Sequence, residues 1–296
     1  MNKFRSPARM VFNIINYVIL ISTGLICLIP FINLLAISFS NSGAVAAGKV
    51  VFWPVGFTTA SYEFAFTNNR FFPALLVSIE RVILGTGVNL LFMIMAAYPL
   101  SKNKQQFRAR NVFMVYFVAT MIISGGLIPT YILVTKLKLL NSIWALILPD
   151  ALPIWTMVIL MNFMRQMPQE VEEAAIVDGA GVWRRLFSVM LPLLAPALAT
   201  VSLFCAVWHW NDWFSGLIYM QSPTKYPLQT YLQGLLLKME EIMRMAGIDY
   251  VRLLSMLSVR TGRAAQLFLG ALPMMILYPF LQKYFTKGLV MGSVKG

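Results

Sequence analysis

Charged residues and potential metal ligands are scarce in this sequence. Only 12% of its 296 residues are charged, whereas soluble domains carry about 25%. It has one histidine, His209, and its two cysteines, Cys27 and Cys205, both lie inside apolar runs. These scarcities exclude a histidine-rich metal site and argue against a disulfide or cysteine metal pair. What remains is 59% hydrophobic, with a mean hydropathy of +0.72, which predicts a membrane protein because lipid replaces water around it.

Six apolar stretches are each long enough to cross a bilayer as a helix, which takes about 17 to 25 residues. A cleaved signal peptide is the alternative for the first stretch, but a signal has an apolar core of only about 7 to 15 residues. Prolines within the stretches predict kinks or helix ends. We therefore predict an all-α membrane protein of six transmembrane helices in one domain, 1–296, with spans at about 11–37, 72–100, 111–135, 142–164, 186–216 and 264–282.

Basic residues outnumber acidic ones, which gives a net charge of +13. Nucleic-acid binding fits poorly, because Lys and Arg lie between apolar runs rather than on one polar face. If the chain starts inside, the inner segments hold 13 basic residues, and the outer segments hold four once the last outer loop, which ends near Arg263, is set aside. This asymmetry predicts that both termini are cytoplasmic.

An acidic segment, EEAAIVDGAG at residues 172–181, lies in the predicted cytoplasmic loop 165–185. Pro168 favours a helix start, the acids suit a helix N-terminus, and Gly179 favours a stop with a sharp bend. Two interpretations follow: a solvated loop with two helical turns, or a short surface helix that docks into a partner. Acid–base catalysis fits less well, because nothing nearby in the sequence supplies a pocket, a metal or a nucleophile.

The segment GAVAAGKV, residues 43–50, fits the first part of a phosphate-binding loop. Such a loop needs Ser or Thr next to hold magnesium, and here the residue is Val50. The segment also follows a membrane span instead of a strand. If ATP powers this protein, another chain must therefore hydrolyse it.

The sequence EEAAIVDGAGVWRRLFSVMLPLLAP resembles the EAA loop of ABC-importer permeases. Val189 stands where isoleucine is more usual. The segments FRSPARMVFNIINYVIL near the start, WHWNDWF in the fifth span and YPFLQKYFTKGLVMGSVKG at the end resemble the carbohydrate-uptake branch, the maltose-type and lipo-oligosaccharide-type permeases. The positions that match the loop motif are Glu173, Ala174, Ala175, Gly179, Val189, Leu191 and Pro192.

This resemblance implies a type I ABC-importer permease fold in the bacterial inner membrane. It implies four kinds of partner: a second homologous permease, two ATP-binding subunits, an extracytoplasmic sugar-binding protein and the lipid bilayer. The chain itself would be non-catalytic and bind no cofactor or metal, since ATP and magnesium are used by the partner ATPase. The resemblance makes the loop a coupling helix that docks into the ATPase, with contacts from Glu172, Glu173, Ala174, Ala175, Asp178, Gly179 and, in the tail, Lys287.

Polar and aromatic residues within the spans are candidates for a substrate pathway. They are Trp208, His209, Trp210, Asn211 and Asp212 in the fifth span, with Glu80 and Asp150 elsewhere. Trp208 lies 17 residues after Leu191, about 26 Å along a straight helix, which places it near the outer face. The alternative for the tryptophans is an interfacial aromatic belt. The alternative for Glu80 and its neighbour Arg81 is that their long side chains reach, or snorkel, to water.

The outer loop, about 217–262, is rich in charged residues. Six basic and three acidic residues lie between 225 and 263, which favours an acidic oligosaccharide such as alginate, whereas contact with lipid headgroups is the alternative. The sequence as a whole predicts a permease that forms half the pathway of a binding-protein-dependent sugar importer and couples to the ATPase through residues 172–192. A permease for another solute, a secondary transporter and an intramembrane enzyme are the rival interpretations.

Overall fold

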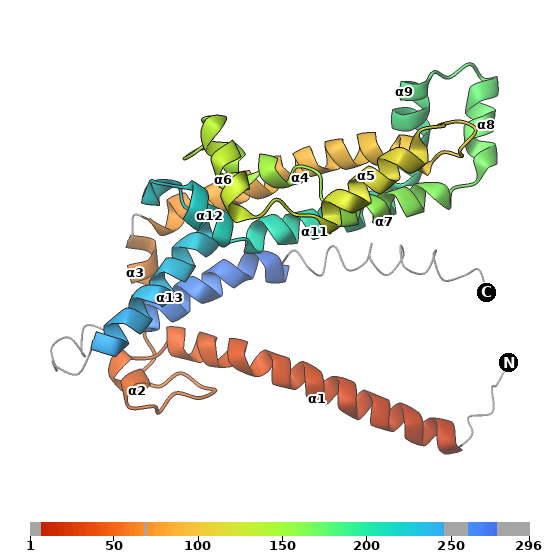
Figure 1. Ribbon diagram of the computed structural model, residues 1–296. Coiled ribbons are helices and arrows are strands. Elements are labelled where there is room, and N and C mark those ends of the chain that lie inside the picture. The colour runs from red at the N-terminus through yellow and green to blue at the C-terminus, as the bar shows by residue number, and fades with distance from the viewer. Residues whose placement is uncertain (1–6, 68–69, 246–259, 277–296) are drawn as a thin grey trace. The chain divides into compact units, whose positions relative to one another are not determined.

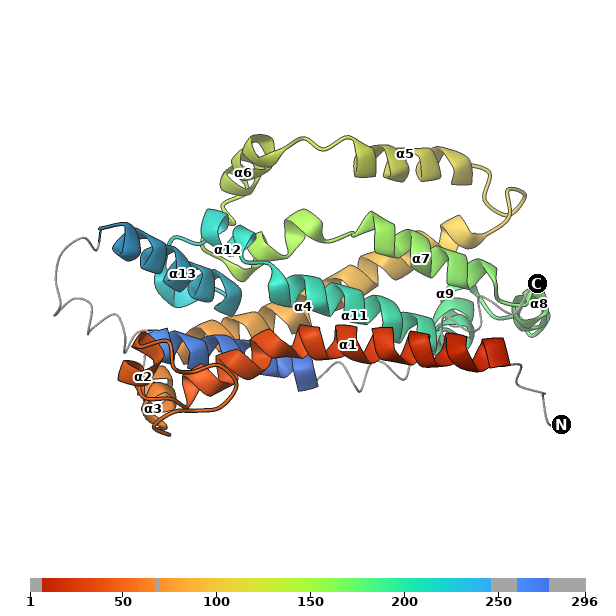
Figure 2. The same ribbon diagram turned by 90° about the horizontal axis from the view of Figure 1, so that it is seen from below.

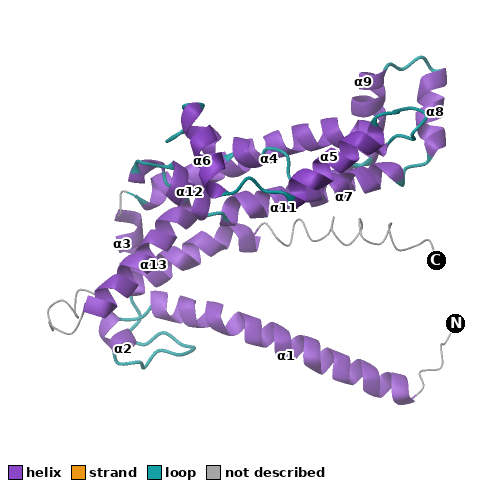
Figure 3. Cartoon of the chain, in the orientation of Figure 1, coloured by secondary structure: helices purple, strands orange, loops and turns teal. Residues whose placement is uncertain are grey.

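The computed structural model describes residues 7–67, 70–245 and 260–276. All regular structure in these residues is helical (Figure 3). The chain divides into two compact units, one drawn from residues 1–71 and 235–271 and the other from residues 72–234 and 272–296.

The first unit begins with three helices, α1, Pro7–Ser38, α2, Ser42–Ala46, and α3, Ala60–Thr67. The 32-residue α1 ends where polar side chains bond locally to the backbone. Ser40 Oγ donates to the Ala36 carbonyl at 2.6 Å, and Asn41 caps α2 by accepting from the Gly43 amide at 2.8 Å. Most of the helix at 260–276 also belongs to this unit.

The second unit holds most of the helices (Figure 1). They are α4, Phe71–Ser101, α5, Arg110–Ile122, α6, Leu127–Lys136, α7, Ile154–Arg165, α8, Gln169–Val177, α9, Val182–Arg184, α10, Leu191–Leu193, α11, Ala195–Asn211, α12, Phe214–Tyr219, and the start of α13, Leu228–Met245. Shorter elements are the 3₁₀ turns Ile143–Leu146, Leu148–Asp150 and Pro223–Lys225 and the π-helical segment Arg185–Met190.

Three of the predicted spans are broken in the structure. The chain bends by 109° between α5 and α6, by 56° between Ile143–Asp150 and α7, and by 83° between Val182–Leu193 and α11. Gly126, with a φ of +85°, lies at the first break, and Pro153 and Pro196 lie at the others, where proline removes a backbone donor. The depth of 26 Å predicted for Trp208 along a straight helix is therefore wrong.

By length and composition alone, α1 and α4 can each cross a membrane, and counting each bent pair as one span raises the number to five. The predicted sixth span, 264–282, is described as far as residue 276. The predicted tail from Tyr278 lies outside the described residues. The loop 217–262 is described only as far as residue 245 and again from residue 260.

A hydrophobic core joins α4, α7 and α11, which lie side by side in both views of the bundle (Figures 1 and 2). Met93 on α4 and Leu160 on α7 are fully buried. The small residues Ala97 and Ala197 are also buried, and small side chains allow helices to approach closely where lipid surrounds them. At one end, Arg165 Nη2 of α7 donates to the Leu100 carbonyl of α4 at 2.9 Å. This packing fixes which residues α4 presents to its neighbours.

Candidate functional site

Arg81 is a fully buried cation in the first half of α4. Its Nη2 donates to Asp212 Oδ2 at 2.5 Å and to the Leu146 carbonyl at 3.2 Å, and its Nη1 donates to the Asp212 carbonyl at 2.9 Å. The guanidinium also lies over the Trp208 ring, 5.7 Å from its centroid. One side chain therefore joins α4 to the end of α11 and to the 3₁₀ turn before α7.

Asn89 lies two helical turns after Arg81 on the same face of α4. Its amide nitrogen donates to the Asp150 and Ala151 carbonyls at 2.8 and 2.9 Å, so its oxygen faces His209, whose Nε2 lies 2.7 Å away. The imidazole must then donate from Nε2. Between them Gly85 leaves room for the ring, because a Cβ at this position would overlap it.

These side chains form one group, called here the embedded cluster: Arg81, Asn89, His209 and Asp212. It satisfies backbone carbonyls at the points where the bent spans expose them. Such carbonyls need partners within the protein, because a bilayer core supplies no water. Ionisable groups at membrane depth persist when they are paired in this way. The arrangement therefore holds the broken helices together, and within the described residues the buried Nδ1 of His209 makes no hydrogen bond.

The structure separates the predicted substrate-pathway residues into two sets. His209 and Trp210 are buried and Asp212 is half-buried, whereas Trp208, Asn211, Glu80 and Asp150 are exposed. Snorkelling of Arg81 to water is wrong, because its side chain is 0% exposed. Sequence reasoning missed Arg81 and Asn89 as site residues. The signal was present: Arg81, Gly85 and Asn89 are spaced by four along one apolar helix.

The predicted coupling segment forms α8 and the bend after it, at the end of the bundle where α4 and α7 also end (Figure 1). Pro168 stands just before the first helical residue, as its fixed φ favours. Gly179 has a φ of +74°, and its amide donates to the Ile176 carbonyl at 3.0 Å. The following Ala180 amide donates to the Ala175 carbonyl at 2.9 Å. Glycine adopts this left-handed conformation without strain, so the helix stops here as the sequence predicts.

Glu172 points from α8 back to the end of α4. Its Oε1 accepts from the Tyr98 hydroxyl at 3.0 Å, and its Oε2 forms an ion pair with Lys102. Burial opposes ionisation of Glu172, but the hydrogen bond and charge of Lys102 outweigh it and hold the pKa of Glu172 below its ordinary range. Burial likewise lowers the pKa of Lys102, with the carboxylate acting in the opposite direction. We call Tyr98, Lys102 and Glu172 the helix-end cluster.

The predicted coupling residues thus face two ways. Glu172 and Ala175 face the protein itself, the latter buried, whereas Glu173, Ala174, Asp178 and Gly179 are exposed. Val177, which the sequence analysis did not single out, is 86% exposed on the same side. Lys287 lies outside the described residues.

Comparisons with known proteins identify the family of this chain. The family model described as "Binding-protein-dependent transport system inner membrane component" matches residues 89–290. The polygalacturonan/rhamnogalacturonan transport system permease protein YtcP of Bacillus subtilis is 36% identical over 96% of this chain and 98% of its own length. Protein LplC of the same organism is 36% identical over 98% of this chain and 97% of its own.

Among solved structures, a chain of a bacterial ABC transporter involved in the import of the acidic polysaccharide alginate superposes with a TM-score of 0.84. It is 29% identical, and the match covers 96% of this chain and all of that one. The chain has the type I importer permease fold. Because the family match covers most of the sequence and the relatives match over nearly their full length, the chain belongs to the inner membrane components of binding-protein-dependent transport systems.

Proposed function

We propose that this chain is a permease subunit of an ATP-driven importer of acidic oligosaccharides. The observation that carries the substrate class is a shared chemistry: a 36% identical relative is named for polygalacturonan/rhamnogalacturonan transport, and the matching structure comes from an importer of alginate. Polygalacturonan and alginate are both polymers of uronic acids. The excess of basic residues between 225 and 263 supports the same class, because it favours an anionic solute.

The chain would form half of the translocation pathway, with a second, homologous permease forming the other half. On the side of the substrate, the exposed Trp208 and Asn211 of α11 are the pathway contacts we propose. A flat indole stacks on a sugar ring, and an amide exchanges hydrogen bonds with hydroxyls. The buried His209 and Trp210 would then position α11 and leave the contact with sugar to their neighbours.

Coupling to ATP would pass through the exposed side of α8. Glu173, Ala174, Val177 and Asp178 form a compact surface with one aliphatic projection, which suits insertion into a cleft of a partner ATPase. Two such ATPase subunits would use ATP and magnesium, while this chain binds neither. An extracytoplasmic binding protein would deliver the sugar from the opposite side. Both termini would be cytoplasmic, as the distribution of basic residues favours.

Reconstitution into proteoliposomes tests this function directly. The complete complex, with ATP enclosed and binding protein outside, should take up labelled oligogalacturonate or alginate fragments in preference to neutral oligosaccharides of the same length. Uptake should stop when ATP is replaced by a non-hydrolysable analogue. A preference for neutral sugars would contradict the substrate class, and uptake by this chain alone on an ion gradient would contradict the importer itself.

A further inference from the structure

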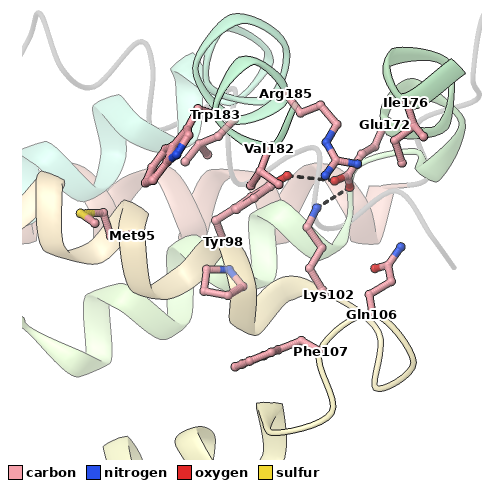
Figure 4. A pocket seen from close by; sticks show the side chains of 12 residues that line it. Met95, Tyr98, Lys102, Gln106, Phe107, Glu172, Ile176, Val182, Trp183 and Arg185 are labelled. Carbon is pink, nitrogen blue, oxygen red and sulfur yellow. Dashed lines mark hydrogen bonds and ion pairs between the residues drawn. The ribbon is translucent and has the colours of Figure 1, made fainter. Parts of the chain in front are cut away.

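A pocket of about 560 Å³ opens beside the helix-end cluster. It lies between the last turns of α4, the loop that follows α4, and the segments α8 and α9 (Figure 4). Its volume is within the range of small-molecule sites, about 300–1,000 Å³. The proposed docking face of α8 lies elsewhere, since Glu173, Ala174 and Asp178 do not line this pocket.

The walls of the pocket change from apolar to charged along α4. Met95 and Trp183 line the part beside the helix, and Lys102 and Arg185 line the part at its end (Figure 4). Met95 and Lys102 are seven residues apart, which is about 10 Å along a helix axis. A membrane changes from hydrocarbon to headgroups over a similar depth, about 5–8 Å on each side. The pocket therefore changes from apolar to charged in the same way as a membrane leaflet changes from acyl chains to headgroups.

The charged residues that line the pocket carry a net positive charge of one. Lys102 and Arg185 are basic, and Glu172 is the acid between them. Glu172 is already held by Lys102 and by Tyr98. Within the described residues, the buried Nε of Arg185 makes no hydrogen bond. The pocket can thus accept an anion whose oxygens reach the guanidinium.

Aromatic side chains extend the apolar wall to the surface. Trp183 is 61% exposed and Phe187 is 52% exposed, and their rings stack with centroids 6.0 Å apart. Met95 is also 47% exposed. Exposed tryptophan next to basic residues is typical of the boundary between acyl chains and headgroups. This combination favours an amphiphile from the membrane over a water-soluble anion.

We propose that this pocket binds an anionic phospholipid of the adjacent leaflet. One acyl chain would lie against Met95 and Trp183, and the headgroup phosphate would face Arg185 and Lys102. The lipid would touch the end of α4 and the start of the π-helical segment together. Bound lipid would then stabilise the position of α8, the segment that we propose to dock with the ATPase.

Two adjacent arginines provide a matched test. Arg185 lines the pocket, whereas Arg184 is exposed and does not. We would purify the complete complex in detergent, add phosphatidylglycerol or phosphatidylcholine, and count retained lipids by native mass spectrometry. Wild type and Arg184→Gln should retain phosphatidylglycerol selectively. Arg185→Gln should bind it about fivefold more weakly, the factor corresponding to the loss of one basic group near an anionic surface.

Equal lipid retention by Arg184→Gln and Arg185→Gln would overturn the proposal, as would equal retention of the two lipids by wild type. Loss of ATPase subunits from Arg185→Gln in every lipid would also overturn it, because the pocket would then be a protein contact. A second variant, Trp183→Ala, should lower retention of both lipids through the acyl-chain wall. These readouts measure bound lipid, so they stand apart from the transport assay that tests the function.

Discussion

Two ion pairs along α4 lie in different surroundings. Arg81, in the first half of the helix, pairs with Asp212, and Lys102, just after its last residue, pairs with Glu172. The exposed fractions of the side chains are 0% and 14% in the first pair and 14% and 17% in the second. Arg81 also binds two backbone carbonyls, while Lys102 gains only a nearby ring, that of Tyr98. We infer that the first pair fixes the fold and that the second positions α8.

The largest loss of stability is expected from substitution of Arg81, whose side chain is fully buried. Arg81→Met should destabilise the protein by about 3–5 kcal/mol, because Asp212 and two carbonyls lose their partner away from water. Denaturant titration of the purified protein would measure it. Arg108→Met, at an exposed position, is the control. The double variant Arg81→Met with Asp212→Asn should recover part of the loss. Equal stability of Arg81→Met and Arg108→Met would show that the embedded cluster does not hold the fold.

The next largest effect is expected from a substitution in the bend after α8, near the end of α4. Gly179→Pro cannot keep a φ of +74° and loses the amide that bonds Ile176, so the helix stop should weaken by about 3 kcal/mol. We expect the protein to fold but to lose the ATPase subunits on co-purification, or to hydrolyse ATP without transport. Gly181→Ala is the control, because its φ is −65° and a Cβ there meets open space. Normal coupled transport by Gly179→Pro would contradict the docking role.

A smaller effect is expected between α4 and α11. Gly85→Ala places a Cβ against the His209 ring and should cost about 1–3 kcal/mol, because the ring must move off Asn89. Gly87→Ala on the same helix meets open space and should be neutral or stabilising by up to about 1 kcal/mol. Thermal unfolding of both variants would compare them. A Gly85→Ala protein as stable as Gly87→Ala would show that the histidine contact is loose.

The smallest effect belongs to the helix-end cluster. Glu172→Gln should cost about 1 kcal/mol at neutral pH, because the amide oxygen can still accept a hydrogen bond and the charge is what the pair loses. Because the pKa of Glu172 is lowered in the folded protein, its stabilisation is present above the ordinary pKa of 4.5 and is lost as pH falls through the folded value. The stabilities of Glu172→Gln and wild type should therefore converge in acid.

Glu173→Gln is the matched control for Glu172→Gln, because Glu173 is exposed on the proposed docking face. It should leave stability unchanged and weaken co-purification of the ATPase. The opposite pattern, with Glu173 governing stability and Glu172 governing assembly, would reverse the two orientations described for α8.

The helix α8 was predictable because its signals are local. A proline start, a glycine stop and a family motif all lie within about 25 residues of one another. The orientation of its side chains was less predictable: Ala174 and Ala175 both belong to the motif, yet the first is exposed and the second buried. Which face turns inward depends on Lys102, 70 residues away from Glu172 in the chain.

The embedded cluster was not predicted because its partners are distant in sequence. Arg81 and Asp212 are 131 residues apart, and a lone cation in an apolar stretch fits snorkelling as well as pairing. The breaks in the spans were only partly signalled, since prolines mark kinks and helix ends alike. Angles such as 83° depend on how the broken segments pack, and packing between distant segments has no local signature.

The length of α4 matters as well as its contacts. Arg81 and Ser101, the last helical residue before Lys102, are 20 residues apart on one continuous helix, which is about 30 Å, close to the thickness of the hydrocarbon layer. The other candidate spans described in the second unit bend sharply along their length. Among the spans described in the second unit α4 is therefore the unbroken one, and its length sets the spacing between the embedded cluster and the helix-end cluster.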